Sequence, residues 1–112
     1  MIPFNKPYLV GSESKNINEV LLENYWSGDG KFSTKCRKWL KENSKCVKSL
    51  LTHSCTGALE IAAFLLNLDV NDEVIMPSYT FVSTANAFVI RGAKPVFVDI
   101  RSDTKNINEE LI

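Results

Sequence analysis

The sequence has few of the residues from which metal centres and disulfide frameworks are built. It contains one histidine and three cysteines, Cys36, Cys46 and Cys55, with no CxxC pair among them. An odd number of widely spaced cysteines fits neither a disulfide scaffold nor a zinc site. We therefore expect no bound metal and a reducing compartment, the cytoplasm.

Neither sign of charge predominates. The 13 lysines and arginines balance 13 aspartates and glutamates, so the formal net charge is zero. Without a basic excess, neither nucleic acid nor an acidic membrane surface is the expected partner. The apolar runs fall short of the roughly 20 residues that a membrane span requires, and the start MIPFNKPYLV lacks the features of a signal peptide. We expect no export and a small-molecule ligand.

Hydrophobic residues make up 45% of the 112 residues, a share typical of a soluble globular domain. In the first half, apolar residues spaced about one helical turn apart predict a helix over residues 16–25. Gly28 and Gly30 interrupt the pattern after it. Ser33 or Thr34 is then expected to cap a second amphipathic helix.

Strand-like and helix-like segments alternate from residue 46 onward. Strands are expected over 46–51, 72–76 and 94–100, with helices over 57–66 and 81–90 between them. This alternation predicts an α/β fold, a mostly parallel sheet with flanking helices. The helix over 57–66 is apolar on nearly every side, so we expect it to be covered on both faces.

The last residues predict a helix that is begun and not completed. Asn106 or Asn108 is a suitable cap, and Glu109 and Glu110 suit a first helical turn. Three strands also make a small sheet for this fold class. We therefore expect residues 1–112 to be a single partial domain, the N-terminal portion of a longer protein.

The segment LTHSCTGALE, residues 51–60, joins the first expected strand to the following helix. A helix start at the carboxyl end of a strand presents free N–H groups and a partial positive charge, which suit a phosphate. Gly57 would let a phosphate approach the backbone, and Ser54 and Thr56 would add hydroxyl donors. Helix capping by Ser54 or Thr56 explains the same residues without a ligand. The absence of GxxxxGK[ST] and GxGxxG argues against nucleoside triphosphates and dinucleotides.

Four other residues have both a functional and an ordinary interpretation. Phe81, in PSYTFVSTANAF, suits stacking on a flat ring, but it also suits the core at a helix start. His53 is interpreted as peripheral, since no cysteine or carboxylate constellation surrounds it in the sequence. Cys55 at a helix start is a possible nucleophile, although a small packing residue explains it too. Asp99, at the end of the third strand, suits either the orientation of a ligand or a loop, or an ordinary turn.

The segments SGDGKF, LTHSCTGALE, NDEVIMPSYTFVSTANAFVIRGAKPVFVDI and DTKNINEELI together resemble the DegT family of sugar aminotransferases. The resemblance covers essentially the whole chain. It implies the N-terminal portion of the large domain of the pyridoxal 5′-phosphate (PLP)-dependent aspartate aminotransferase fold, fold type I, in a homodimer. It also implies that Thr56 and Gly57 hold the cofactor phosphate and that Phe81 stacks on the pyridine ring. His53 and Gly57 stand where proline and alanine are common in the family.

The resemblance places the lysine that forms the aldimine with the cofactor downstream of residue 112. Neither Lys48 nor Lys94 lies in the corresponding motif, so no catalytic residue is expected within the chain. The implied reaction transfers an amino group from glutamate to a dTDP-4-keto-6-deoxyhexose, giving dTDP-4-amino-4,6-dideoxygalactose for surface polysaccharide synthesis. The alternatives are a sibling transaminase for another nucleotide keto sugar and a truncated, non-catalytic binding or interaction domain.

Overall fold

A computed structural model describes all 112 residues. The chain divides into two compact parts, Met1–Leu50 and Leu51–Ile112, each of which is described by itself. None of the helices combines the length and the apolar character that a membrane crossing requires.

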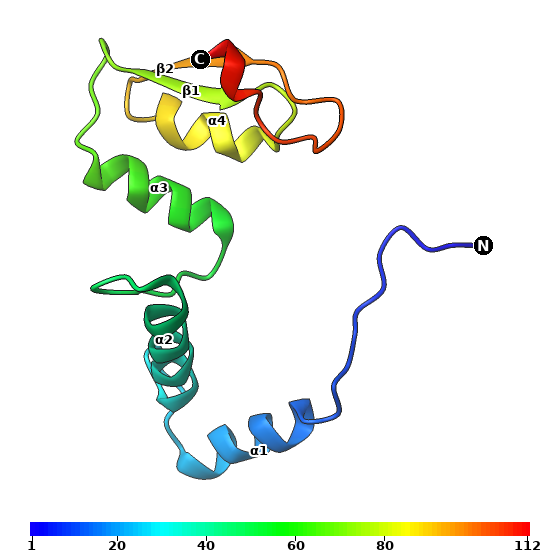
Figure 1. The fold of residues 1–112 in the computed structure, drawn as a ribbon. Helices are drawn as coiled ribbons and strands as arrows, with labels where there is room; N and C mark the ends of the chain where they lie inside the picture. The colour runs from blue at the N-terminus through cyan, green and yellow to red at the C-terminus, as the bar shows by residue number, and fades with distance from the viewer. The chain divides into compact units, whose positions relative to one another are not determined.

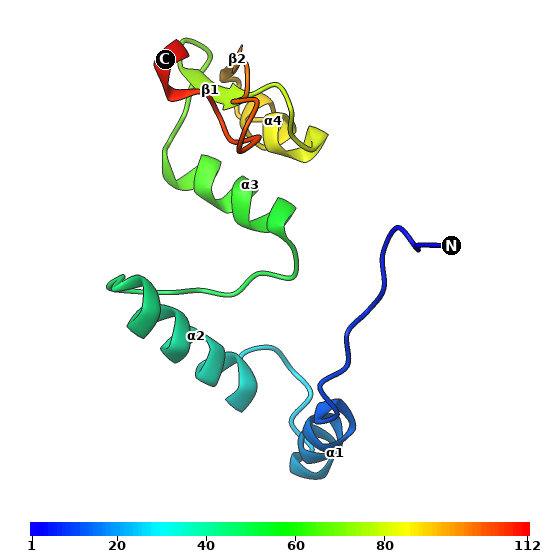
Figure 2. The ribbon, with the colours of Figure 1, turned by 45° about the vertical axis from the view of Figure 1, so that its right-hand side comes forward.

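The first part contains two helices, α1 (Glu13–Glu23) and α2 (Lys31–Ser44), seen in blue to green in Figure 2. Both expected helices are confirmed, but the expected cap of the second at Ser33 or Thr34 was wrong. Gly30 precedes α2 in an extended conformation, and no side chain caps the helix. The ammonium of Lys31, in the first turn of α2, pairs with carboxylates of α1, which favours the earlier start.

Those carboxylates belong to Glu19 and Glu23, and each lies in contact with the Lys31 ammonium. The hydrogen bond from Lys31 lowers the pKa of Glu19, and the bonds to Glu19 and Glu23 raise the pKa of Lys31. A second ion pair joins Arg37 of α2 to Asp29 in the connecting loop. These ion pairs, whose two cations are half-buried, therefore link α1, α2 and the loop between them.

The second part contains α3 (Cys55–Leu65), β1 (Glu73–Pro77), α4 (Val82–Val89), β2 (Lys94–Val98) and a short 3-10 helix, η1 (Glu109–Leu111). The two strands pair in parallel, with α4 as the crossover between them. Helix α4 contacts β2 and packs against α3 (Figure 1). The expected alternation of helices and parallel strands is confirmed over residues 55–98.

The expected strand over residues 46–51 was wrong, because this segment forms no strand. Val47 and Leu50 are 90% and 64% exposed. Apolar β-formers give a segment a tendency to extend, but a strand also needs a neighbour to accept its hydrogen bonds. Strands β1 and β2 pair only with each other, so the sheet has two strands and not three.

The core of the second part is built from three alanines and a methionine on α3, α4, β1 and the loop before β2, with α4 packed against both α3 and the sheet. Its buried hydrophobic residues are Ala63, Met76, Ala87 and Ala93. The expected covering of α3 on both faces was wrong: Ile61, Phe64 and Leu65 are exposed, since α4 is the element that packs against this helix. Arg91 lies over the ring of Phe64, 5.0 Å from its centroid.

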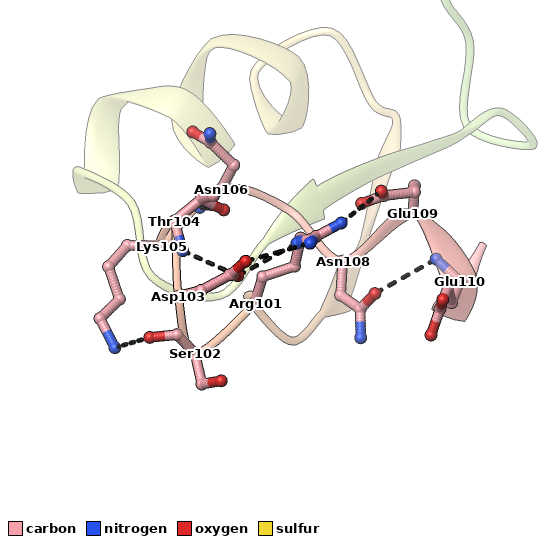
Figure 3. A network of polar contacts seen from close by, with 9 residues as sticks. All are labelled: Arg101, Ser102, Asp103, Thr104, Lys105, Asn106, Asn108, Glu109 and Glu110. Carbon is pink, nitrogen blue, oxygen red and sulfur yellow. Dashed lines mark hydrogen bonds and ion pairs between the residues drawn. The ribbon is translucent and has the colours of Figure 1, made fainter.

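The loop after β2 is held by Arg101 (Figure 3). Its guanidinium donates to the carboxylates of Asp103 and Glu109, at 3.1 and 2.8 Å. These hydrogen bonds raise the pKa of Arg101, and the bond from Arg101 lowers the pKa of Asp103. The expected cap at Asn108 is confirmed, since its side chain accepts from the N–H of Glu110 at 3.3 Å, although the element it starts is the 3-10 helix η1.

Candidate functional site

The first turn of α3 has a well-defined cap. Ser54 adopts extended backbone angles, and its Oγ accepts a hydrogen bond from the N–H of Gly57 at 3.0 Å. The Ser54 carbonyl accepts from the N–H of Ala58 at 3.1 Å. The hydroxyl of Thr52 donates to the same carbonyl at 2.7 Å, which ties the preceding loop to the helix. The capping interpretation is therefore confirmed for Ser54.

The cap leaves two backbone donors at the start of α3 without a partner. The N–H groups of Cys55 and Thr56 make no hydrogen bond within the chain. Unpaired N–H groups and the positive end of the helix dipole together make such a terminus suitable for an anion. The Thr56 hydroxyl, on a half-buried side chain, is a third possible donor. The geometry fits one phosphate group.

Gly57 is buried, and its environment differs from the one expected from the sequence. Its N–H is already bound by Ser54, so the unpaired donors are one and two positions earlier. A Cβ at this position would lie 3.1 Å from Cε1 of His53 and 3.4 Å from Oγ of Ser54. The absence of a side chain at Gly57 thus makes room for the His53 ring, a contact that the sequence did not reveal.

Phe81 precedes α4 and occupies its N-cap position in an extended conformation. Its side chain is 76% exposed, so Phe81 does not have the core position that the sequence also allowed. The carbonyl of Phe81 accepts from the N–H of Thr84 at 2.9 Å, and the hydroxyls of Thr80 and Thr84 are 3.0 Å apart. These bonds fix the backbone around an aromatic ring that is free to receive a ligand.

The fold brings the candidate residues to one end of the second part. Figure 1 shows the starts of α3 and α4 and the carboxyl ends of β1 and β2 at the same end, and Figure 2 agrees for the two helix starts. Thr56 and Gly57 lie in the first turn of α3, and Phe81 caps α4. Ligands of open α/β sheets bind outside the carboxyl ends of the strands, so this end is the candidate site.

Two other candidate residues, Lys94 and Asp99, make contacts that stabilise the fold. Lys94 begins β2, at the opposite end of the strands, and its ammonium is 3.1 Å from the carboxylate of Glu73. Asp99 follows β2, and its carboxylate accepts from the N–H of Ile100 at 2.7 Å. Its carbonyl accepts from the N–H of Asn108 at 3.0 Å. The interpretation of Asp99 as a turn residue is confirmed.

The fold and the site together define a class. Parallel strands with a helical crossover, and a helix start with unpaired donors at the carboxyl end, are typical of α/β proteins that bind phosphorylated ligands. Residues 7–112 match the model of the DegT/DnrJ/EryC1/StrS aminotransferase family. The chain belongs to this family.

Individual relatives agree with this assignment. The chain is 36% identical over 111 residues to an uncharacterized protein of Methanocaldococcus jannaschii, covering 97% of the chain and 29% of that protein. It is 32% identical over 110 residues to GDP-perosamine synthase of Vibrio cholerae, covering 98% of the chain and 30% of the synthase. The chain thus spans less than a third of the length of these relatives.

Solved structures show the same fold. The aminotransferase TlmJ from Streptoalloteichus hindustanus matches all of the chain with 31% of its own length, at a TM-score of 0.84 and 30% identity. A protein of Streptococcus pneumoniae assigned as a sugar aminotransferase, in its PLP form, matches 98% of the chain with 28% of its own length, at a TM-score of 0.80 and 29% identity. The expected fold class, part of the PLP-dependent aminotransferase fold, is confirmed.

Proposed function

We propose that the chain is the N-terminal portion of the cofactor-binding large domain of a PLP-dependent sugar aminotransferase that acts in the cytoplasm as a homodimer. The observation that carries this proposal is the first turn of α3, where the N–H groups of Cys55 and Thr56 have no partner within the chain. Membership of the aminotransferase family supplies the ligand that such a turn would bind.

The residues at this end of the second part would bind different groups of the cofactor. The unpaired N–H groups and the Thr56 hydroxyl would bind the phosphate, and buried Gly57 would keep the turn narrow enough for close approach. Phe81, largely exposed at the start of α4, would stack on the pyridine ring. When bound, the cofactor supplies the electron sink that amino transfer requires.

No residue of this chain is proposed as a catalytic base. Lys94 is paired with Glu73 at the amino ends of the strands, and Lys48 lies in the exposed segment before α3. Positioning and orienting the cofactor are therefore the proposed contributions of residues 1–112. The lysine that would react with the cofactor is proposed to lie in the rest of the protein.

The proposed amino donor is glutamate and the proposed acceptor is a nucleotide-linked 4-keto-6-deoxy sugar. The sequence resemblance favours a dTDP-linked sugar with dTDP-4-amino-4,6-dideoxygalactose as the product. A second candidate is a GDP-linked sugar, because two relatives, from Vibrio cholerae and Escherichia coli O157:H7, are GDP-perosamine synthases at 32% identity. The two candidates share amino transfer to a nucleotide-linked keto sugar and differ in both the nucleotide and the sugar.

An assay of the complete protein with PLP and glutamate, offering the dTDP-linked and GDP-linked keto sugars separately, tests the proposal. We expect 2-oxoglutarate to form with one of them, and Thr56→Val and Phe81→Leu to weaken PLP binding. Thr84→Val is the matched control, because the Thr84 hydroxyl bonds to Thr80 and a loss there removes no proposed cofactor contact. A protein that neither binds PLP nor transfers an amino group would support the non-catalytic alternative.

A further inference from the structure

The single histidine of the chain lies against the first turn of α3, and the proposed function does not use it. A Cβ at Gly57 would lie 3.1 Å from Cε1 of His53 and 3.5 Å from its Nδ1. Cε1 is the carbon between the two ring nitrogens. The polar edge of the imidazole therefore faces the helix start, and its carbon edge is turned away.

Neither ring nitrogen has a hydrogen-bond partner in the chain. No backbone or side-chain group bonds to the imidazole of His53, and the residue is exposed. Two residues further along, the N–H of Cys55 is also without a partner, as is that of Thr56. One short stretch thus presents two unpaired backbone donors and an imidazole with an unpaired polar edge.

Gly57 is the residue that permits this arrangement. A separation of 3.1 Å is tighter than most contacts of a Cβ atom, so a side chain at position 57 would require the His53 ring to shift by a few tenths of an ångström. The N–H of Gly57 is meanwhile held by Ser54 at 3.0 Å. Because Gly57 has no side chain, the His53 ring can lie close to the first turn of α3.

We propose that His53 is a further phosphate-binding residue of the cofactor site, whose ring lies in the space that a side chain at Gly57 would fill. This inference rests on the proposed function and deepens it by adding one residue. A ring N–H would donate to a phosphate oxygen beside the two backbone donors. The ligand class is a phosphate monoester, and the unphosphorylated vitamer pyridoxal lacks the group that His53 would bind.

The test compares the dissociation constants of PLP and pyridoxal for the complete protein and its variants, followed by absorbance or fluorescence. His53→Phe keeps a ring against Gly57 but removes both nitrogens, and we expect it to weaken PLP binding about tenfold, the loss of one charge-assisted hydrogen bond. Pyridoxal binding should not change. His53→Gln, which restores an N–H donor, should recover part of the affinity for PLP.

A second variant tests the role of Gly57. Gly57→Ala should also weaken PLP binding in the protein with His53, because the new methyl group would shift the ring from its place beside the helix start by a few tenths of an ångström. In a protein that already carries His53→Phe, Gly57→Ala should change the ratio of the PLP and pyridoxal dissociation constants little further, since the imidazole donor is already absent. Far-ultraviolet circular dichroism and unchanged pyridoxal binding check that each variant is folded.

The outcomes separate this inference from the proposed function. If the unsubstituted protein prefers PLP to pyridoxal and His53→Phe leaves that preference unchanged, His53 is not a phosphate ligand and the proposed function stands. If the unsubstituted protein shows no preference for PLP, the phosphate site itself is wrong and both proposals fail. Equal weakening of PLP and pyridoxal by His53→Phe assigns the ring a purely structural role and overturns the inference.

Discussion

Replacing Ser54 with alanine removes the only side-chain cap of α3 and tests how the helix start is held. The Ser54 Oγ accepts the N–H of Gly57 at 3.0 Å, and no other side chain accepts from an N–H of that turn. Loss of a serine cap costs about 1 kcal/mol, which is about a fivefold increase in the population of the opened turn. We expect the amide of Ala58, bonded to the Ser54 carbonyl, to exchange with solvent about fivefold faster.

Amide hydrogen exchange followed by nuclear magnetic resonance measures this effect locally. The matched control is Ser33→Ala, because Ser33 lies within α2 and caps nothing. Exchange in the first turn of α2 should stay the same or slow slightly, since alanine favours helix more than serine. Equal effects of the two substitutions, or unchanged exchange at Ala58 in Ser54→Ala, would refute the assignment of Ser54 as the cap.

Two further predictions concern the backbone of the second part and the ion pairs of the first. Gly92 has φ of +93°, and a Cβ there would lie 3.0 Å from Cγ1 of Val70, so Gly92→Ala should destabilise the protein by about 1–3 kcal/mol in thermal melts. Gly28→Ala, which meets nothing within 4 Å, should change the melting temperature little. Because Lys31 lowers the pKa of Glu19 from 4.5, the pair stabilises α1 and α2 above that pH and loses this effect as the pH falls through the lowered value. Lys31→Met should return the Glu19 pKa, read from a carboxyl titration, towards 4.5, and an unchanged titration would contradict the pairing.

The helices and two of the three expected strands could be predicted from the sequence because their signals are local. Apolar spacing gave α1 and α3 to within a few residues, and the expected strand over 72–76 corresponds to β1, Glu73–Pro77. The expected strand over 46–51 failed for a physical reason: a strand depends on a partner elsewhere in the chain, which composition does not report. The cap of α2 was missed because Lys31, paired with α1, begins the helix before Ser33.

The candidate site was partly predictable. A small-residue junction before an apolar helix indicated an anion site, and the structure has unpaired donors in that turn. The rotamer of Ser54 decides which backbone donors are unpaired, because its Oγ accepts the hydrogen bond from the N–H of Gly57. No sequence pattern specifies this rotamer. The contact between His53 and Gly57 likewise depends on how the loop turns into α3. In the sequence, the only sign of this contact is a histidine four residues before a glycine.

The central claim is that the start of α3 binds the phosphate of PLP through the backbone of Cys55 and Thr56. The most direct test is a titration of the complete protein, labelled with nitrogen-15 in cysteine and threonine, with PLP and separately with pyridoxal. The account predicts that the amide signals of Cys55 and Thr56 shift with PLP and shift much less with pyridoxal. Equal shifts with both vitamers, or amide signals at these two positions that do not respond to PLP, would contradict it.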